Sequence, residues 1–267
     1  MLRFALIVIC CTAVPACGPG DTGGAIVRFH AYAAGLSDAS AGSEFDTSSG
    51  FHVTLTSARL HIGAVYMRLA ATNPGSANSA CVGDTTYGLQ VPGPVDVDVL
   101  SAELQEFSVL GRATDDLDQS AEIWLTGGDI NNVNDDTVLV DVTGHASGSG
   151  FDGDFRGSLT ISTNRLIPVT NPAMPGANPI CKQRIIAPIP VRVKPSVGGN
   201  LLLRVNPEPW FDNLDFSVLE PSDGDGSVLE IPDENSGPDP DAAAGRAFFL
   251  GVTGASGTTY DFSWLSP

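Results

Sequence analysis

Histidine and methionine are the side chains of this sequence best suited to metal chemistry. The four histidines are His30, His52, His61 and His145. None of them stands at the i, i+2 or i, i+4 spacing of a local ligand pair, but strands distant in sequence can bring such residues together in a sheet. Imidazoles, with the soft sulfur of Met67 or Met174, suit copper. We take His30, His52 and His61 as candidate copper ligands. The alternative for each is an ordinary surface position on a strand.

Two acidic segments offer oxygen ligands for calcium instead. Asp223, Asp225 and Ser227, with Glu234, follow part of the spacing of an EF-hand loop. Val228 stands where that loop needs glycine for its sharp turn, which argues against an EF-hand. A second set of oxygen ligands comprises Asp129, Asn131, Asp135 and Asp136. The alternative for both segments is a solvated acidic loop.

No catalytic motif stands out in the sequence. The sequence contains no G-x-S-x-G, H-E-x-x-H or P-loop pattern. Its carboxylates are scattered through loops, so none can be chosen as an acid/base pair. Residues 148–153 match G-x-G-x-x-G, but a strand-like segment follows where a dinucleotide site needs a helix. That stretch therefore predicts a β-hairpin loop. We expect a protein that is not an enzyme, with a hydrolase built from loops as an alternative.

The first residues have the pattern of an export signal. Arg3 supplies a positive charge, and residues 4–13 form an apolar run shorter than the roughly twenty residues that span a bilayer. The following Val14-Pro15-Ala16-Cys17 resembles the lipobox of bacterial lipoproteins, from which only Pro15 departs. The resemblance implies a signal peptide over residues 1–16, lipidation of Cys17 and a flexible tether over residues 17–24. The alternative is a plain signal peptide with a chance cysteine.

Cys81 and Cys181 remain in the exported body of the chain. An exported chain meets an oxidising compartment, where a lone pair of cysteines is most simply one disulfide. The alternative is a two-thiolate metal site, but neither cysteine belongs to a C-x-x-C motif. We therefore expect a Cys81–Cys181 disulfide.

The chain is strongly acidic, with 31 Asp and Glu against 13 Lys and Arg and a formal net charge of −18. Such a charge argues against a nucleic-acid partner and against electrostatic adhesion to anionic lipid. It is compatible with a cationic ligand, and equally with solubility alone.

Strand-like segments separated by Gly, Pro, Asn and Asp dominate the remaining chain. They cover residues 25–34, 51–69, 89–91, 95–100, 120–126, 137–146, 155–163, 183–194, 200–205, 247–252 and 258–265. Gly63 could mark the point where one long strand becomes two. Pro188 and Pro190 place the segment 183–194 at a sheet edge.

Three segments depart from the strand pattern. Residues 100–110 are the best helical candidate, although they could equally form a strand. Residues 207–216 read as an aromatic corner, and residues 220–246 as a long mobile acidic loop. Together the patterns predict an all-β fold, an antiparallel β-sandwich of immunoglobulin-like or jelly-roll-like kind with long acidic loops, in one domain over residues 25–267.

Three blocks of the sequence carry a family resemblance. They are RFHAYA at residues 28–33, GFHVTLTSARLHIGAVYM at residues 50–67, and DTVLVDVTGHASG followed by FRGSLTI and LLLRVNPEPWF. Their order resembles the MbnP-like family of bacterial periplasmic or surface proteins, over about half the chain. The resemblance implies a β-rich fold and an association with copper in some members. It assigns no metal ligand residue by residue.

The sequence leaves three hypotheses of function. We favour a lipid-anchored cell-envelope protein with a non-catalytic binding or structural role. A copper- or calcium-binding envelope protein is the first alternative, and the loop-built hydrolase is the second. We expect the membrane as a partner through the lipid anchor, together with an envelope protein or ligand. The location expected is the outer membrane, with the domain facing the periplasm or the cell surface.

Overall fold

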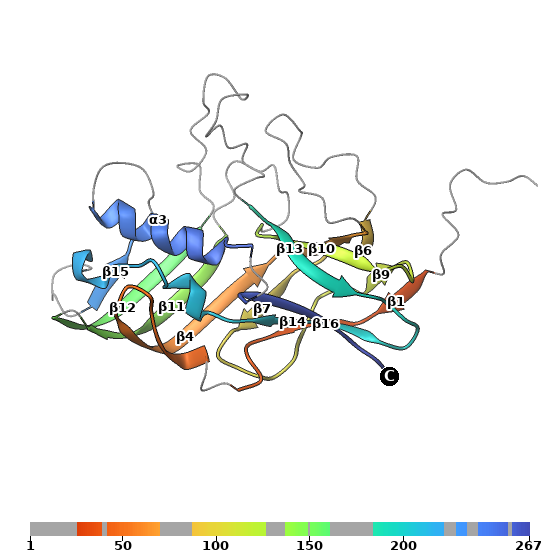
Figure 1. Ribbon diagram of the computed structural model, residues 1–267, viewed down its shortest axis with the longest axis horizontal. Helices are drawn as coiled ribbons and strands as arrows, with labels where there is room; N and C mark the ends of the chain where they lie inside the picture. The colour runs from red at the N-terminus through yellow and green to blue at the C-terminus, as the bar shows by residue number, and fades with distance from the viewer. Residues whose placement is uncertain are drawn as a thin grey trace, which may run out of the picture.

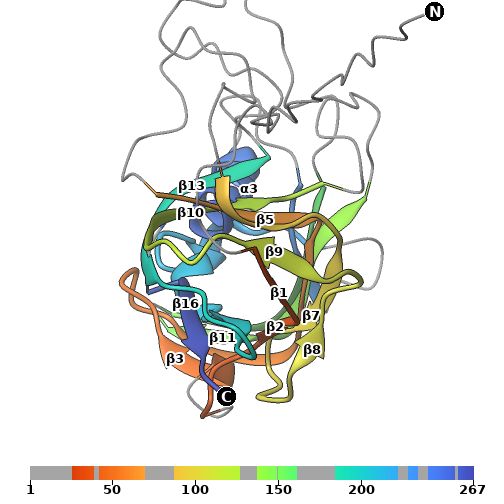
Figure 2. The same cartoon turned by 90° about the vertical axis from the view of Figure 1, so that its right-hand side faces the viewer.

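The computed structural model describes residues 26–38, 42–69, 87–126, 137–148, 150–160, 184–221, 228–233, 240–255 and 258–267. Within these ranges the chain is mostly β-strand and forms three sheets. Most neighbouring strands pair antiparallel, and β12 (Phe151–Thr160) with β15 (Val228–Ile231) and β14 (Asn200–Val205) with β2 (Ala31–Ala34) pair parallel. This confirms the predicted all-β sandwich. Figure 1 shows the molecule with its long axis horizontal, and Figure 2 looks along that axis at strands facing one another across the core.

The first sheet has six strands. In order across the sheet they are β1 (Val27–Phe29), β9 (Gly111–Ala113), β6 (Tyr87–Val91), β5 (Ala64–Arg68), β10 (Asp118–Trp124) and β13 (Ile185–Val193). The strand β13 lies at the sheet edge, as its two prolines predicted, and its Ala187–Pro188 peptide bond is cis.

The second sheet holds the longest strands. In order they are β15 (Val228–Ile231), β12 (Phe151–Thr160), β11 (Val138–Gly148), β4 (His52–Ile62) and β3 (Glu44–Asp46), and β7 (Val95–Asp98) pairs with the far end of β4. The G-x-G-x-x-G stretch forms the tight β11–β12 hairpin, as predicted. Gly148 and Gly150 both have positive φ there, which suits glycine.

The third sheet closes the sandwich at one side. Its order is β16 (Tyr260–Leu265), β14 (Asn200–Val205), β2 (Ala31–Ala34) and β8 (Gln105–Glu106). In the described residues the named helical elements are the 3₁₀ turns η2 (Glu208–Trp210) and η3 (Phe216–Val218) and the α-helix α3 (Pro240–Val252). None of the described helices is long and apolar enough to cross a membrane.

Buried side chains from all three sheets form one continuous hydrophobic cluster. The first strands, predicted over residues 25–34, alternate: Val27, Phe29 and Ala31 are buried while Arg28 and His30 are exposed. An aromatic group fills the end of the core under the second sheet, where Phe211 packs on Phe155 at 5.7 Å between ring centroids. The inner face of that sheet is therefore covered, and its outer face bears polar side chains.

Gly63 separates β4 from β5, as the sequence predicted. A Cβ atom at this position would lie 2.3 Å from the carbonyl oxygen of Thr126, so only glycine fits without a shift. The Gly63 amide donates to the carbonyl of Trp124 at 2.9 Å, which fixes the junction to β10. One extended run thus leaves the second sheet and enters the first.

The helix considered for residues 100–110 is not present. Only Gln105–Glu106 is extended, as β8, and it pairs with β2. The Gln105 side chain holds the backbone of Asp98 through bonds of 2.7 and 3.2 Å. Among the apolar residues of this segment, Phe107 is buried but Leu104 and Leu110 are exposed, so they do not form one buried face as they would on a packed helix.

Two predictions near the C-terminus were wrong. Residues 247–252 belong to α3 rather than to a strand, because Ala244, Phe248 and Val252 recur every fourth residue and bury one helical face. The predicted loop at 220–246 contains the short strand β15 and the start of α3.

The burial of α3 gives a direct stability test. Phe248 is 1% exposed and its ring lies 5.5 Å from that of Phe211, so Phe248→Ala removes a fully packed aromatic group. We expect a loss of about 3–5 kcal/mol in the free energy of unfolding. Leu250→Ala, at a position 52% exposed on the same helix, should cost less than about 1 kcal/mol. Equal losses in denaturant titrations would contradict the helical assignment.

Candidate functional site

Two histidines on neighbouring strands are each held between two carboxylates. His52, near the start of β4, has Nδ1 at 2.9 Å from Asp46 and Nε2 at 3.3 Å from Glu44. His145 of β11 has Nδ1 at 2.8 Å from Asp154 and Nε2 at 3.4 Å from Asp152. Both imidazoles are more than two-fifths exposed. The same arrangement is therefore built twice on one sheet.

The strand register places these groups on one face. One row across β3, β4, β11 and β12 runs through Asp46, His52, Ser147 and Asp152. The next row runs through Glu44, Thr54, His145 and Asp154. Directly opposite side chains share a face, and diagonal neighbours lie about 7–8 Å apart. We call this surface the His–carboxylate face, comprising Glu44, Asp46, His52, His145, Asp152 and Asp154.

The electrostatics of the His–carboxylate face favour positive charge. Its four carboxylates surround two imidazoles, with no Lys or Arg in either row. The hydrogen bond that the protonated His52 donates to Asp46, together with the charges of Asp46 and Glu44, raises the pKa of His52 above its usual value of 6.5 against the opposing effect of burial. Protonation of the imidazoles offsets part of the negative charge of the four carboxylates, and a bound cation would do the same.

Three of the histidines were predicted as metal ligands, and the structure does not bring those three together. His61 lies nine positions from His52 on the same strand, a separation of about 30 Å. Its Nδ1 is 2.6 Å from Asp96 of β7. His30 lies between β1 and β2, with Nδ1 at 2.5 Å from Glu106. The register instead makes His52 a diagonal neighbour of His145, and Met67 is buried in the core.

No group of three or more His, Cys, Asp or Glu side chains in the described ranges has the geometry to hold a metal ion as it stands. On the His–carboxylate face, the carboxylates already occupy the ring nitrogens. A metal would have to displace them.

Several predicted site residues lie outside the described residues. They are Cys17, Cys81, Cys181, Met174, the 129–136 set, and Asp223, Asp225, Ser227 and Glu234 of the EF-hand-like loop. The lipidation of Cys17 and the Cys81–Cys181 disulfide therefore stay predictions.

The outer face of the first sheet carries a second polar group, which the sequence did not suggest. The guanidinium of Arg68 pairs with Glu122, and both side chains are at least 94% buried. Tyr87 and Trp124 each donate to the other Glu122 oxygen at 3.2 Å. Ring contacts join Tyr66 to Tyr87 and to Trp124. This network is well satisfied, which favours a structural role.

Asp118 lies at the start of β10 beside that network. Its side chain is fully buried, and neither carboxylate oxygen has a hydrogen-bond partner within the described part of the chain. A Cβ atom on Gly88 would lie 2.4 Å from its Oδ1. Burial, with a smaller effect from Asp116, raises the pKa of Asp118 to about 7. The carboxyl group is therefore protonated in part at neutral pH.

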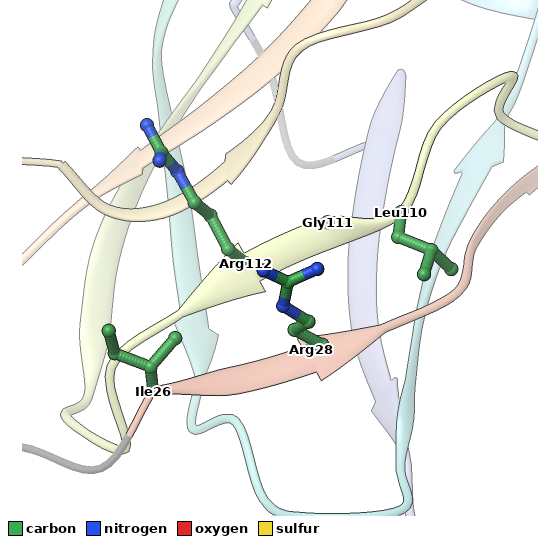
Figure 3. Close-up of a pocket in the computed structure, with 5 residues that line it drawn as sticks. All are labelled: Ile26, Arg28, Leu110, Gly111 and Arg112. Carbon is green, nitrogen blue, oxygen red and sulfur yellow. The ribbon is translucent and has the colours of Figure 1, made fainter.

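A shallow pocket of about 220 Å³ lies at the β1 edge of the first sheet. Arg28 and Arg112 stand directly opposite each other on β1 and β9, between Ile26 and Leu110 (Figure 3). Arg112 donates to Gln90 at 2.8 Å. Neither arginine has a carboxylate within ion-pair distance among the described residues. The pocket is therefore cationic and apolar in an otherwise acidic chain.

The sequence contains a partial signal for the His–carboxylate face. Glu44-Phe-Asp46 and Asp152-Gly-Asp154 each place two carboxylates on one side of a strand by their i, i+2 spacing. Nothing in the sequence fixes which strands pair, or in which register. The link between His52 and His145 was missed for that reason.

Comparison with known proteins adds little to this description. No family model matches the chain, and no curated protein matches it. One solved structure, MbnP from Methylosinus trichosporium, is similar over 91% of this chain and 100% of its own, at 12% sequence identity and a TM-score of 0.36. At that TM-score neither the fold nor the function of this chain follows from the likeness.

The His52 pairing predicts a pH response. Because the folded pKa is raised, the ion pairs stabilise the protein below pH 6.5, and this contribution is lost as pH rises through the folded pKa. Histidine NMR titration should give His52 a pKa above 6.5, and Asp46→Asn should lower it. An unchanged His52 titration in Asp46→Asn would contradict the assigned contact.

Asp118 predicts a pH response of the same sign, in a lower pH range. Its folded pKa of about 7 exceeds the usual 3.8, so stability falls as pH rises from about 4 to about 7, and the full cost is present above pH 7. Asp118→Asn should therefore stabilise the protein at pH 8 by at most about 4 kcal/mol. Chemical denaturation at pH 8 and pH 4 checks this. A destabilised variant at pH 8 would show that the ionised carboxylate has a favourable partner.

Proposed function

We propose that the chain is a lipid-anchored cell-envelope protein with a non-catalytic binding role, and that it binds a positively charged group on the His–carboxylate face. The double arrangement of an exposed imidazole between two carboxylates carries this proposal. Carboxylates on a rigid sheet bind cations with little reorganisation. A cationic group of a ligand can therefore replace the protonated imidazoles of His52 and His145 as the partner of these carboxylates. The lipobox-like sequence supports the envelope location.

The favoured ligand class is the basic segment of an envelope protein. The outer face of β3, β4, β11 and β12 is long and polar, and η2, η3 and α3 cover the opposite face (Figure 1). An exposed sheet surface with regular rows of carboxylates suits an extended chain of Lys or Arg residues, because complementary charge gives specificity and a fast association rate. Catalysis has no support from the groups on this face.

A divalent transition metal is the second candidate, and copper is its first example. The diagonal placement of His52 and His145 favours it, because two imidazoles about 7–8 Å apart at their backbones can turn toward one ion. Calcium would use the carboxylates alone. Either metal would have to compete with the carboxylate–imidazole contacts seen here.

Titration calorimetry on the full chain separates these candidates. The probes are a Lys-rich peptide, Cu²⁺ and Ca²⁺. We expect the peptide to bind wild type and to bind about tenfold or more weakly to Asp46→Asn/Asp152→Asn, since two charge-assisted contacts are lost. Asp115→Asn/Asp261→Asn, at exposed positions outside the His–carboxylate face, is the matched control and should bind as wild type.

Each result of that titration has a clear meaning. Stoichiometric copper binding that is lost in His52→Asn/His145→Asn but kept in His30→Asn/His61→Asn would select the metal candidate. Peptide binding that is equal in both carboxylate variants would reflect the general acidity of the chain and would contradict the proposed site.

A further inference from the structure

Arg28 and Arg112 form an uncompensated pair of positive charges. Like charges directly opposite each other in a sheet are destabilising. Two other arginines are neutralised, since Arg68 pairs with Glu122 and Arg156 pairs with Glu230. Arg28 and Arg112 share no carboxylate within the described ranges, although acidic residues outnumber basic ones more than twofold. Such a pair suits an external anion, and guanidinium groups bind phosphate in a bidentate manner.

Apolar side chains flank the two arginines. Ile26 is 75% exposed and Leu110 is 49% exposed, and both line the same pocket as the arginines (Figure 3). Each of them directly precedes a strand, Ile26 before β1 and Leu110 before β9, two positions from the arginine of that strand. Positive charges beside exposed aliphatic groups match the headgroup boundary of a bilayer, where phosphates lie next to apolar chains.

The covalent chain brings this pocket close to the membrane. Ile26 follows Cys17 by nine residues, so a lipid on Cys17 keeps Ile26 within about 30 Å of the bilayer even at full extension. The pocket therefore lies at the end of the molecule that the anchor holds at the surface.

We propose that Arg28 and Arg112, with Ile26 and Leu110, form a membrane-facing surface that binds the phosphate headgroups of the bilayer in which the chain is anchored. This inference rests on the proposed lipid anchor. The net charge of the chain repels an anionic surface, so a cationic end near the anchor favours approach to it. The contact orients the domain: β1 and β9 lie at one end of the long axis, while the β11–β12 hairpin of the His–carboxylate face lies toward the other (Figure 1).

Arginine modification tests the orientation in the lipidated protein. The full mature chain, purified from membranes, is placed in vesicles of phosphatidylcholine alone or mixed equally with phosphatidylglycerol, and treated with phenylglyoxal. Mass spectrometry reports the modification rate at each arginine. Arg28 and Arg112 should react up to about thirtyfold more slowly in the anionic vesicles, since each basic residue at such a surface contributes about a factor of five. Arg192, exposed on the opposite edge strand β13, should react at an unchanged rate.

Variants show whether the four residues act together. Ile26→Asp/Leu110→Asp should restore fast modification of Arg28 and Arg112 in anionic vesicles. Arg192→Glu/Lys194→Glu, which changes charge on β13, should leave their protection intact.

The remaining outcomes each decide the question. Equal reactivity in both vesicles, in a chain whose intact mass shows the lipid, would overturn the membrane-facing surface and leave the anchor standing. Equal protection by inorganic phosphate without vesicles would assign the pair to a soluble anion instead. A mass without lipid would overturn the anchor and this inference together.

Discussion

The crossing of one extended run between two sheets is the constraint on which the architecture depends. Residues 52–68 form β4 in the second sheet and β5 in the first, and the change of sheet occurs at Gly63. The close approach of Thr126 leaves no room for a Cβ atom at that position. Both strands lie inside their sheets, between partners on either side. A one-residue shift of register in this run would therefore move buried side chains to the solvent face, and exposed ones to the core, in both sheets at once.

The same run connects the two surfaces that we assign to function. Its first residues carry His52 into the His–carboxylate face, and its last residues carry Tyr66 and Arg68 into the polar network of the first sheet. The first sheet continues from there to the Arg28–Arg112 pocket at β1. Negative and positive surfaces thus occupy different sheets of one continuous core. A rigid body with opposite charge at separate places has a preferred orientation at a charged membrane.

Much of the fold could be predicted from the sequence, because strands are recognisable from the alternation of apolar and polar residues and from the turn residues that flank them. The alternation at residues 26–32, the break at Gly63 and the proline-marked edge at β13 are examples. Residues 247–252 were misassigned because the pattern AFFLGV is short, and only the buried contacts of α3 decide its helical period. The candidate site was predictable only in its parts. His52 was named, but its partner His145 and the arginine pair depend on strand order and register, which local sequence does not encode.

The central claim is that the His–carboxylate face meets a partner in the envelope, and in-cell photocrosslinking tests it most directly. A photoreactive residue replaces Thr56, an exposed position on β4 next to this face, or Arg192 on β13 as a control. We expect a discrete crosslinked species from position 56, absent from position 192 and lost when Asp46 and Asp152 are neutralised. Equal crosslinking from both positions, or crosslinking that survives neutralisation, would contradict it.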